Sequence, residues 1–186
     1  SIIDKLHLSE KEIEVSYVIS NKKGAQALKR AEKNQIPFYL IDEKIYNNKE
    51  DYEQEIIKVI DENDIDLIVL AGYMKILSVR FVKYFQDKII NIHPSLLPAF
   101  PGLDAQKQAV DYGVKVSGCT VHFVDEGVDS GPIIKQKTVK VNYQDNEESL
   151  SQKILKYEHQ LLPEVIELIS KGKVEIDGNR TVRIKE

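Results

Sequence analysis

The chain has 186 residues, of which 42% are hydrophobic and 30% are charged. This composition is typical of a globular protein with one domain or at most two small ones. The formal net charge of −4 argues against a general nucleic-acid binder, and no run approaches the roughly 18 apolar residues of a membrane span. The single cysteine, Cys119, cannot form a disulfide within the chain and provides no cysteine cluster for zinc. A reducing, cytoplasmic setting is therefore the simplest interpretation.

The first residues have the pattern of a helix end. Ser1 to Leu6 contains no initiator methionine and no signal-peptide pattern, and its apolar residues form a stripe like that of the last turns of a helix. We therefore expect residues upstream of Ser1 to be absent from this numbering.

Up to about residue 92, the hydrophobic periodicity alternates between the strand and helix patterns. The expected strands are 14–20, 37–41, 66–71 and 88–92, and the expected helices are 24–34, 51–63 and 78–85. This alternation predicts a mostly parallel sheet with right-handed crossovers and helices on both faces. Ligands of such sheets bind beyond the carboxyl ends of the strands, where the turns at 72–75 and 91–102 are expected to lie.

The C-terminal part has a different pattern. A helix is expected at 104–112, and two strands at 118–124 and 132–141 are joined by an acidic, glycine-containing loop. A long amphipathic helix follows at 149–170, and Asp177-Gly178 within 173–184 indicates a hairpin. Neither a repeat nor a linker interrupts the chain, so residues 1–186 are expected to form a single domain.

Asn91 and His93 stand at the end of the apolar segment 88–92, which has the length of a strand. Side chains two residues apart on a strand lie on one face, so both project the same way. Pro94 favours an extended backbone at His93. An amide N–H beside a titratable ring can stabilise a developing oxyanion and move a proton. The alternative is a strand end followed by a proline-rich turn.

Asp129 and His122 are two further candidates for this site. A carboxylate within reach of His93 could orient the ring and raise its pKa, although an aspartate between glycines is also a common turn residue. His122 shares a strand face with Thr120, and the sequence leaves open whether it is structural, exposed or part of a site. No two histidines have the spacing of metal ligands, so no metal site is expected.

Other residues have both a binding and a structural interpretation. Segment 74–77 follows a buried strand, where it could contact a ligand or pack at the start of a helix. Lys49 could be a solvated charge or lie near an anionic ligand, and Glu158 has the setting of a surface carboxylate. The chain contains no phosphate-binding P-loop, no complete G-x-G-x-x-G fingerprint and no nucleophile elbow.

Four motifs occur around these candidates. They are 91–98 (NIHPSLLP), 100–102 (FPG), 118–124 (GCTVHFV) and 128–134 (VDSGPII). Together they resemble the folate-dependent formyltransferases, over the whole chain from Ser1 to the expected hairpin. Pro94 and the segment 70–77 (LAGYMKIL) are similar to the branch that formylates glycinamide ribonucleotide in purine synthesis. The resemblance implies an α/β, Rossmann-like formyltransferase fold, with a mostly parallel twisted sheet, helices on both faces and an antiparallel edge near the C-terminal half.

The resemblance also implies roles for particular residues. The catalytic residues are Asn91, His93 and Asp129. The pterin of the co-substrate 10-formyltetrahydrofolate contacts Met74, Lys75, Ile76, Leu77, Asp125, Glu126, Gly127 and Val128. Lys49 matches a basic contact to the folate, where an arginine is often found, and Glu158 resembles the carboxylate that contacts the glycinamide side. The implied partner is the small molecule glycinamide ribonucleotide, with no metal, nucleic acid or membrane, in a monomer or homodimer.

The front of the chain departs from the family pattern. Members begin with a strand and a Gly-Ser-Asn-rich loop that binds the substrate phosphate at a helix N-terminus. Residues 1–4 resemble the continuation of that helix, so the domain is expected to lack its first strand and its phosphate-binding loop.

The implied reaction is direct formyl transfer. The amine of glycinamide ribonucleotide attacks the formyl carbon, Asn91 donates a hydrogen bond to the oxyanion, and protonated His93 is the proton donor. Asp129 orients His93 and helps to move the amine proton, through water, to the leaving folate nitrogen. The alternatives are a 10-formyltetrahydrofolate hydrolase, a transfer-RNA formyltransferase and a catalytically silent folate-binding module. The hydrolases usually have an extra N-terminal domain and a histidine in place of Pro94.

Overall fold

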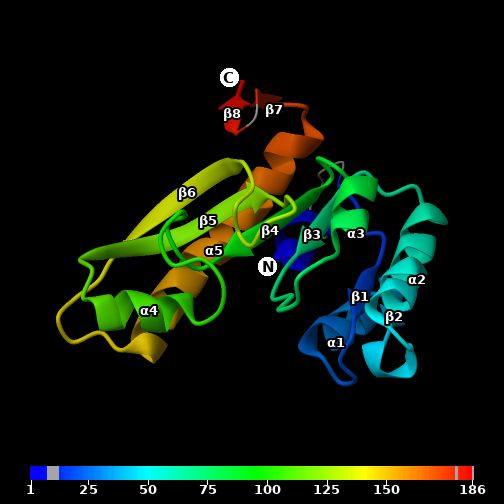
Figure 1. Ribbon diagram of the computed structural model, residues 1–186, viewed down its shortest axis with the longest axis horizontal. Coiled ribbons are helices and arrows are strands. Elements are labelled where there is room, and N and C mark those ends of the chain that lie inside the picture. The colour runs from blue at the N-terminus through cyan, green and yellow to red at the C-terminus, as the bar shows by residue number, and fades with distance from the viewer. Residues whose placement is uncertain (8–12, 179, 186) are drawn as a thin grey trace.

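Figure 1 shows the computed structural model of the chain, which describes residues 1–7, 13–178 and 180–185. The helices are η1 (Ile3–His7), α1 (Gln26–Lys33), η2 (Glu43–Ile45), α2 (Lys49–Asp61), α3 (Val79–Tyr84), α4 (Ala105–Tyr112) and α5 (Glu147–Ser170). The strands are β1 (Val18–Ser20), β2 (Phe38–Leu40), β3 (Ile68–Leu70), β4 (Ile89–His93), β5 (Val116–Phe123), β6 (Ile133–Lys140), β7 (Val174–Asp177) and β8 (Thr181–Ile184). Strands and helices alternate up to β4, as the periodicity predicts.

The strands pair in parallel near the N-terminus and antiparallel near the C-terminus. β1 pairs with β2 in parallel, and a four-stranded sheet has the order β3-β4-β5-β6. Within that sheet β3 and β4 are parallel, whereas β4–β5 and β5–β6 are antiparallel. β7 and β8 form an antiparallel hairpin, as Asp177-Gly178 predicts, although residue 179 lies outside the described residues. The α/β class with an antiparallel edge in the C-terminal half is confirmed.

Most expected elements are present, and their boundaries differ for identifiable reasons. The strand expected at 14–20 is reduced to β1, because only its last residues pair with β2. α2 begins at Lys49, two residues before the expected start, because the Asn48 side chain caps it by accepting from the Asp51 N–H. α5 likewise begins at Glu147, where Asn146 and Ser149 form a capping box. Local capping thus adds residues to both helices that hydrophobic periodicity does not detect.

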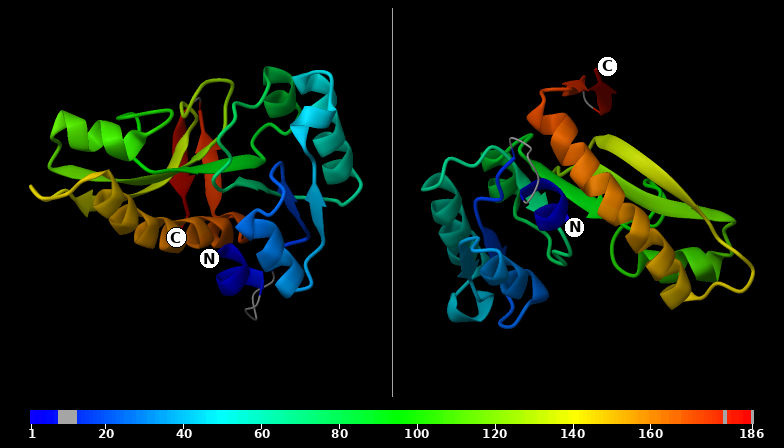
Figure 2. Two further views of the ribbon diagram at one scale, coloured as in Figure 1. Left: turned by 90° about the horizontal axis from the view of Figure 1, so that it is seen from below. Right: turned by 180° about the vertical axis from the view of Figure 1, so that it is seen from behind.

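Two apolar clusters meet at β4. The larger one packs α5 against β5 and β6 and includes Ile90, and the view from behind shows α5 lying across these strands (Figure 2, right). The second cluster lies under α2 and α3 and includes Ile89. Because both faces of β4 are covered, its carboxyl end is held rigidly, and this is the end that carries Asn91 and His93.

None of the helices in the described ranges combines the length and the apolar character needed to cross a membrane.

Candidate active site

Neighbouring strands bring an amide and an imidazole together at the end of β4. The antiparallel register of β4 and β5 places Asn91 directly opposite His122. The Asn91 Nδ2 atom lies 3.3 Å from His122 Nε2 and 3.4 Å from Asp129 Oδ1. His122 Nε2 and Asp129 Oδ1 are themselves only 3.6 Å apart. One N–H of the Asn91 amide can therefore point at both atoms, which leaves its second N–H for a ligand.

His122 is almost fully buried, at 2% exposed. Its Nδ1 lies 2.7 Å from the carbonyl oxygen of Phe123, which can only accept, so Nδ1 carries a hydrogen. Its other ring nitrogen, Nε2, faces both the Asn91 amide and the Asp129 carboxylate. The sequence left the role of His122 open, and the structure places it beside Asn91 and Asp129. The signal that would have found it is the cross-strand register, which pairs it with Asn91.

His93 is buried behind Asp129. Its Nδ1 lies 3.2 Å from Asp129 Oδ2, and its Nε2 lies 2.8 Å from the carbonyl oxygen of Phe100. The carboxylate of Asp129 therefore contacts both Asn91 and His93, so the three residues selected from the sequence lie together.

The carboxylate of Asp129 is held by the backbone as well as by side chains. The residue has a φ of +49°, which is uncommon for a residue other than glycine, and its Oδ2 accepts a hydrogen bond of 2.8 Å from the Gly102 N–H. Burial raises its pKa, but the contacts with His122, with the Gly102 N–H and with His93 outweigh burial and hold that pKa below its usual value. Asp129 is consequently ionised near neutral pH.

The pKa of His93 is lowered, whereas the sequence analysis expected a nearby carboxylate to raise it. The Asp129 carboxylate and the Phe100 carbonyl do raise it, but burial outweighs both and lowers the pKa below its usual value. Withdrawing the ring from water thus disfavours its charged form by more than these two partners favour it. The expectation that Asp129 raises the pKa of His93 above its usual value is therefore corrected.

The loop between β5 and β6 is tied into a compact turn before Asp129. Asp125 Oδ1 accepts from the Gly127 N–H at 3.1 Å and from the Ser130 hydroxyl at 2.6 Å. Glu126 pairs with Lys83 of α3 at 3.2 Å. The two hydrogen bonds accepted by Asp125 hold the loop that presents Asp129 to Asn91, whereas the exposed Lys83–Glu126 pair adds little.

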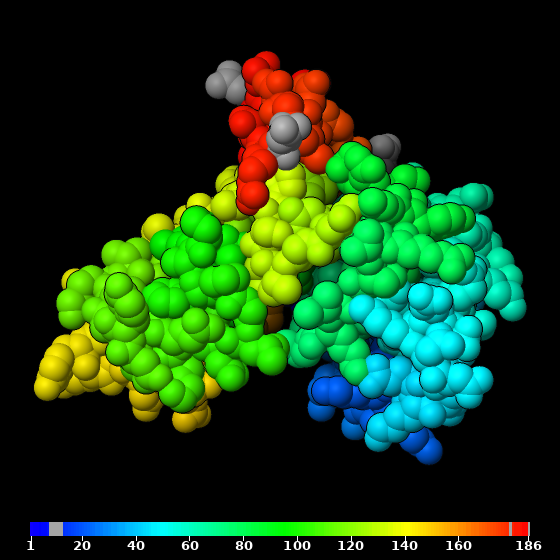
Figure 3. Space-filling view, viewed as in Figure 1, coloured from blue at the N-terminus to red at the C-terminus, as the bar shows by residue number. Residues whose placement is uncertain are grey.

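A hollow of about 90 Å³ opens beside Asn91, His122 and Asp129. In the space-filling view the surface is recessed between the yellow-green loop that carries Asp129 and the green segment that follows β3 (Figure 3). Its other lining residues are Leu70, Tyr73, Lys75, Ile76, Leu77, Val82, Val124, Asp125, Gly127 and Val128. The segments 74–77 and 125–128, which the resemblance assigns to the pterin, thus both border one hollow. Ile76 and Val128 are 63% and 50% exposed. Met74, Glu126 and His93 do not line it.

Two other predicted binding residues lie outside this lining. Lys49 is the first residue of α2, and its Nζ is 3.7 Å from Glu53 Oε1. Glu158 belongs to α5, and burial raises its pKa to about 7. Burial also raises the pKa of Cys119 in β5 to about 12, and the charge of Glu158 adds to that rise. The ligand contacts of Lys49 and Glu158 stay predictions.

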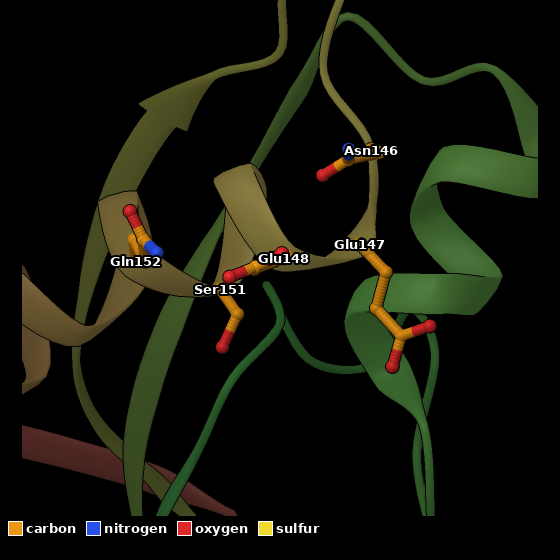
Figure 4. Close-up of a pocket in the computed structure, with 5 residues that line it drawn as sticks. All are labelled: Asn146, Glu147, Glu148, Ser151 and Gln152. Carbon is orange, nitrogen blue, oxygen red and sulfur yellow. The ribbon is translucent and has the colours of Figure 1, made fainter.

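A second, larger depression of about 430 Å³ lies at the start of α5 (Figure 4). It is lined by Asn146, Glu147, Glu148, Ser151 and Gln152. None of these is a candidate from the sequence, and the Asn146 side chain is already engaged by the Ser149 N–H. Within residues 1–7, 13–178 and 180–185, no three His, Cys, Asp or Glu side chains are grouped to hold a metal ion.

A family model described as formyl transferase matches residues 1–166. The chain belongs to the formyl transferase family. It is 43% identical to the phosphoribosylglycinamide formyltransferase of Bacillus subtilis (strain 168) over 166 residues, which cover 89% of this chain and 85% of that protein. The crystal structure of phosphoribosylglycinamide formyltransferase from Anaplasma phagocytophilum matches with a TM-score of 0.93 and 40% identity, covering 100% of this chain and 86% of that one.

Formyl transferase relatives also include much longer proteins. The chain is 44% identical over 163 residues to the trifunctional purine biosynthetic protein adenosine-3 of Gallus gallus, and this match covers 88% of the chain but 16% of that protein. The family assignment made from the motifs at 91–98 and 128–134 is confirmed, and so is the formyl transferase fold.

Proposed function

We propose that the full-length protein transfers the formyl group of 10-formyltetrahydrofolate to the primary amine of glycinamide ribonucleotide, in de novo purine biosynthesis. The observation that carries this proposal is the hollow at which Asn91 and Asp129 meet the segments 73–77 and 125–128. Polar groups at the base of an apolar rim suit a heteroaromatic donor whose reactive group must lie beside them. The relatives named phosphoribosylglycinamide formyltransferase support the same reaction.

The folate would lie partly within the hollow and partly over its rim. A volume of about 90 Å³ is small beside the roughly 300–1,000 Å³ of typical ligand sites. We therefore place the pterin against Leu77 and Gly127, and the rest of the folate over the exposed side chains of Met74, Ile76 and Val128. Lys75, Asp125 and Glu126 complete the two segments that we assign to the folate.

Asn91 would stabilise the negative charge that develops during the reaction. Attack of the amine nitrogen on the formyl carbon forms a C–N bond and moves the carbonyl electron pair onto oxygen. The free N–H of Asn91 can donate to that oxygen, and its direction is set beforehand by His122 and Asp129. A donor that needs no reorganisation is the kind of group that lowers such a barrier most.

Asp129 and His93 would move the proton. The attacking amine has to lose one proton, and the folate nitrogen gains one when its C–N bond to the formyl carbon breaks. Asp129 and His93, 3.2 Å apart, can accept the amine proton as a pair and release it to the leaving nitrogen, directly or through water. The imidazolium formed in between adds positive charge near the oxyanion.

The phosphate of glycinamide ribonucleotide requires donors outside the hollow. We place it at the glycine-rich loop that the family resemblance implies upstream of Ser1. A parallel strand preceding that loop, laid between β1 and β3, would join the two separate sheets into one, and residues 1–186 would then be the remainder of a single domain. Glu158 and Lys49 are assigned to the glycinamide side and to the folate, respectively.

The test is an assay of tetrahydrofolate release by the full-length protein, with and without glycinamide ribonucleotide. Release that depends on the amine is the expected result. Equal release without the amine would indicate a hydrolase, and no release in either arm would indicate a silent folate-binding module. We expect a cytoplasmic monomer or homodimer that acts without a metal, and addition of a chelator is expected to leave the rate unchanged.

A further inference from the structure

Glu53 is a buried carboxylate that the proposed reaction does not use. It lies in α2 and is 3% exposed, which is rare for a glutamate unless it is paired. Its helix neighbours Tyr52, Ile56 and Ile57 are buried apolar residues of the same cluster. A charge in that setting needs partners, because an unpaired buried carboxylate costs far more than an exposed one.

Both oxygens of Glu53 are directed at one residue, Ser78. Oε1 accepts a hydrogen bond of 2.8 Å from the Ser78 N–H, and Oε2 accepts from the Ser78 hydroxyl. Lys49, one helical turn earlier, adds positive charge at 3.7 Å from Oε1. Lys49 thus has an ionic partner within α2. The predicted folate contact of Lys49 did not take this partner into account.

Ser78 is the point at which the segment after β3 becomes a helix. It is the N-cap of α3, where its side chain accepts from the Phe81 N–H at 3.1 Å. The segment 71–77 between β3 and Ser78 has no regular structure, and it contributes Tyr73, Lys75, Ile76 and Leu77 to the hollow. Its first end is fixed by the pairing of β3 with β4, and its second end is fixed by Glu53.

Leu77 packs against the apolar cluster under α2 and α3, and the other polar ties of this segment are weaker or more exposed. Lys75 pairs with Glu43, but their side chains are 39% and 37% exposed, and ion pairs this exposed contribute little. Tyr73 hydrogen-bonds Tyr52, which is a single neutral bond. Glu53 makes two charge-assisted bonds away from water, and bonds of this kind are about twice as strong as neutral ones.

We propose that Glu53 is a positioning residue for folate binding: through Ser78 it sets the place of the segment 73–77 against the hollow. The inference rests on the proposed function, because that segment is assigned to the folate there. Glu53 does not touch the substrates, so its loss should weaken the folate side and leave the glycinamide ribonucleotide side unchanged.

The test uses Glu53→Gln and Ser78→Ala in the full-length protein, with the KM of each substrate measured separately. Each variant is expected to raise the KM for 10-formyltetrahydrofolate about tenfold, the size expected for losing one charge-assisted hydrogen bond. The KM for glycinamide ribonucleotide should change by less than about twofold. The double variant should be no worse than the poorer single variant, because both changes break one contact. Ser78→Thr, which keeps the hydroxyl and the N–H, should behave like the wild type.

The chain offers a matched control on the surface of the same two helices. The Arg80 side chain of α3 donates to Gln54 of α2 at 3.0 Å, and this bond is exposed. Gln54→Ala should leave both KM values unchanged, so an equal rise in this variant would mean that the effect is general loosening of α3 rather than positioning by Glu53.

Binding of tetrahydrofolate, measured by calorimetry without turnover, separates the inference from the proposed function. If the wild type binds no folate, the proposed function fails. If the wild type binds and both Glu53→Gln and Ser78→Ala bind equally well, the role of Glu53 is refuted while the function stands. The Ser78 variants provide this answer even if Glu53→Gln does not fold. A parallel rise in both KM values would also overturn the inference, since it would indicate a general loss of structure.

Discussion

Replacing Gly131 by alanine tests how closely the loop between β5 and β6 must hold Asp129. A Cβ atom at Gly131 would lie 1.9 Å from the carbonyl oxygen of Phe123 and 2.9 Å from its carbonyl carbon. Both atoms belong to the backbone of β5, so no side chain can rotate away. The Phe123 N–H also bonds the Pro132 carbonyl at 2.9 Å, which keeps the two strands at this separation.

The size of the effect follows from these distances. Real Cβ contacts are essentially never shorter than 3.0 Å, so the loop has to move by about 1 Å at Gly131. Asp129 is two residues away, and its contacts with His93 and Gly102 are 3.2 and 2.8 Å long. A displacement of about 1 Å breaks such contacts, and misplacement on this scale can cost about 10²-fold in rate.

The assay is kcat/KM for amine-dependent tetrahydrofolate release, with thermal unfolding as a check that Gly131→Ala is folded. Gly172→Ala is the matched control. Its added Cβ meets open space, but its φ of +65° makes alanine strained, so it should lose stability and keep kcat/KM. A kcat/KM in Gly131→Ala within about threefold of the wild type would show that Asp129 tolerates the displacement and that the loop need not hold it closely.

Three further predictions concern side chains at or near the site. Asn91→Ala should lower kcat about 10²–10³-fold in steady-state turnover, the usual loss for an oxyanion donor, and near-normal turnover would remove Asn91 from the site. His122→Leu should lower kcat about tenfold with a smaller change in either KM, because the Asn91 amide and the Asp129 carboxylate lose the polar ring that holds them in place; a change in KM alone would contradict this role. Glu158 has its pKa raised from 4.5 to about 7 by burial. Its charge therefore destabilises the fold increasingly from about pH 4.5 upwards and fully above about pH 7. Glu158→Gln should accordingly raise the free energy of urea unfolding by about 3 kcal/mol near pH 8 and by little near pH 4, and an equal gain at both pH values would contradict the assignment.

Much of the fold follows from local pattern. Alternating periodicity predicted the order of strands and helices, and the apolar segment at 66–71 predicted β3, although its three residues are only partly buried. Pairing partners are not encoded locally, so the strand expected at 14–20 was too long, because only the end of it meets β2. Polar caps such as Asn48 set the helix starts by single hydrogen bonds that periodicity does not register.

The sequence predicted those features of the candidate site that depend on residues close together in the chain. The shared face of Asn91 and His93 follows from their spacing on one strand. The place of His122 depends on the register between two strands about thirty residues apart, and the orientation of the His93 ring depends on the Phe100 carbonyl in the loop beyond it. Lys49 and Glu53 are four residues apart on one helix, so their pairing could have been recognised from the sequence.

The fate of the labelled formyl carbon of 10-formyltetrahydrofolate distinguishes direct transfer from hydrolysis. When the full-length protein turns over both substrates, we expect the label to appear as an N-formyl group on glycinamide ribonucleotide and Asp129→Asn to slow its appearance greatly. Label released as free formate at the same rate, or transfer undiminished in Asp129→Asn, would contradict direct transfer at this site.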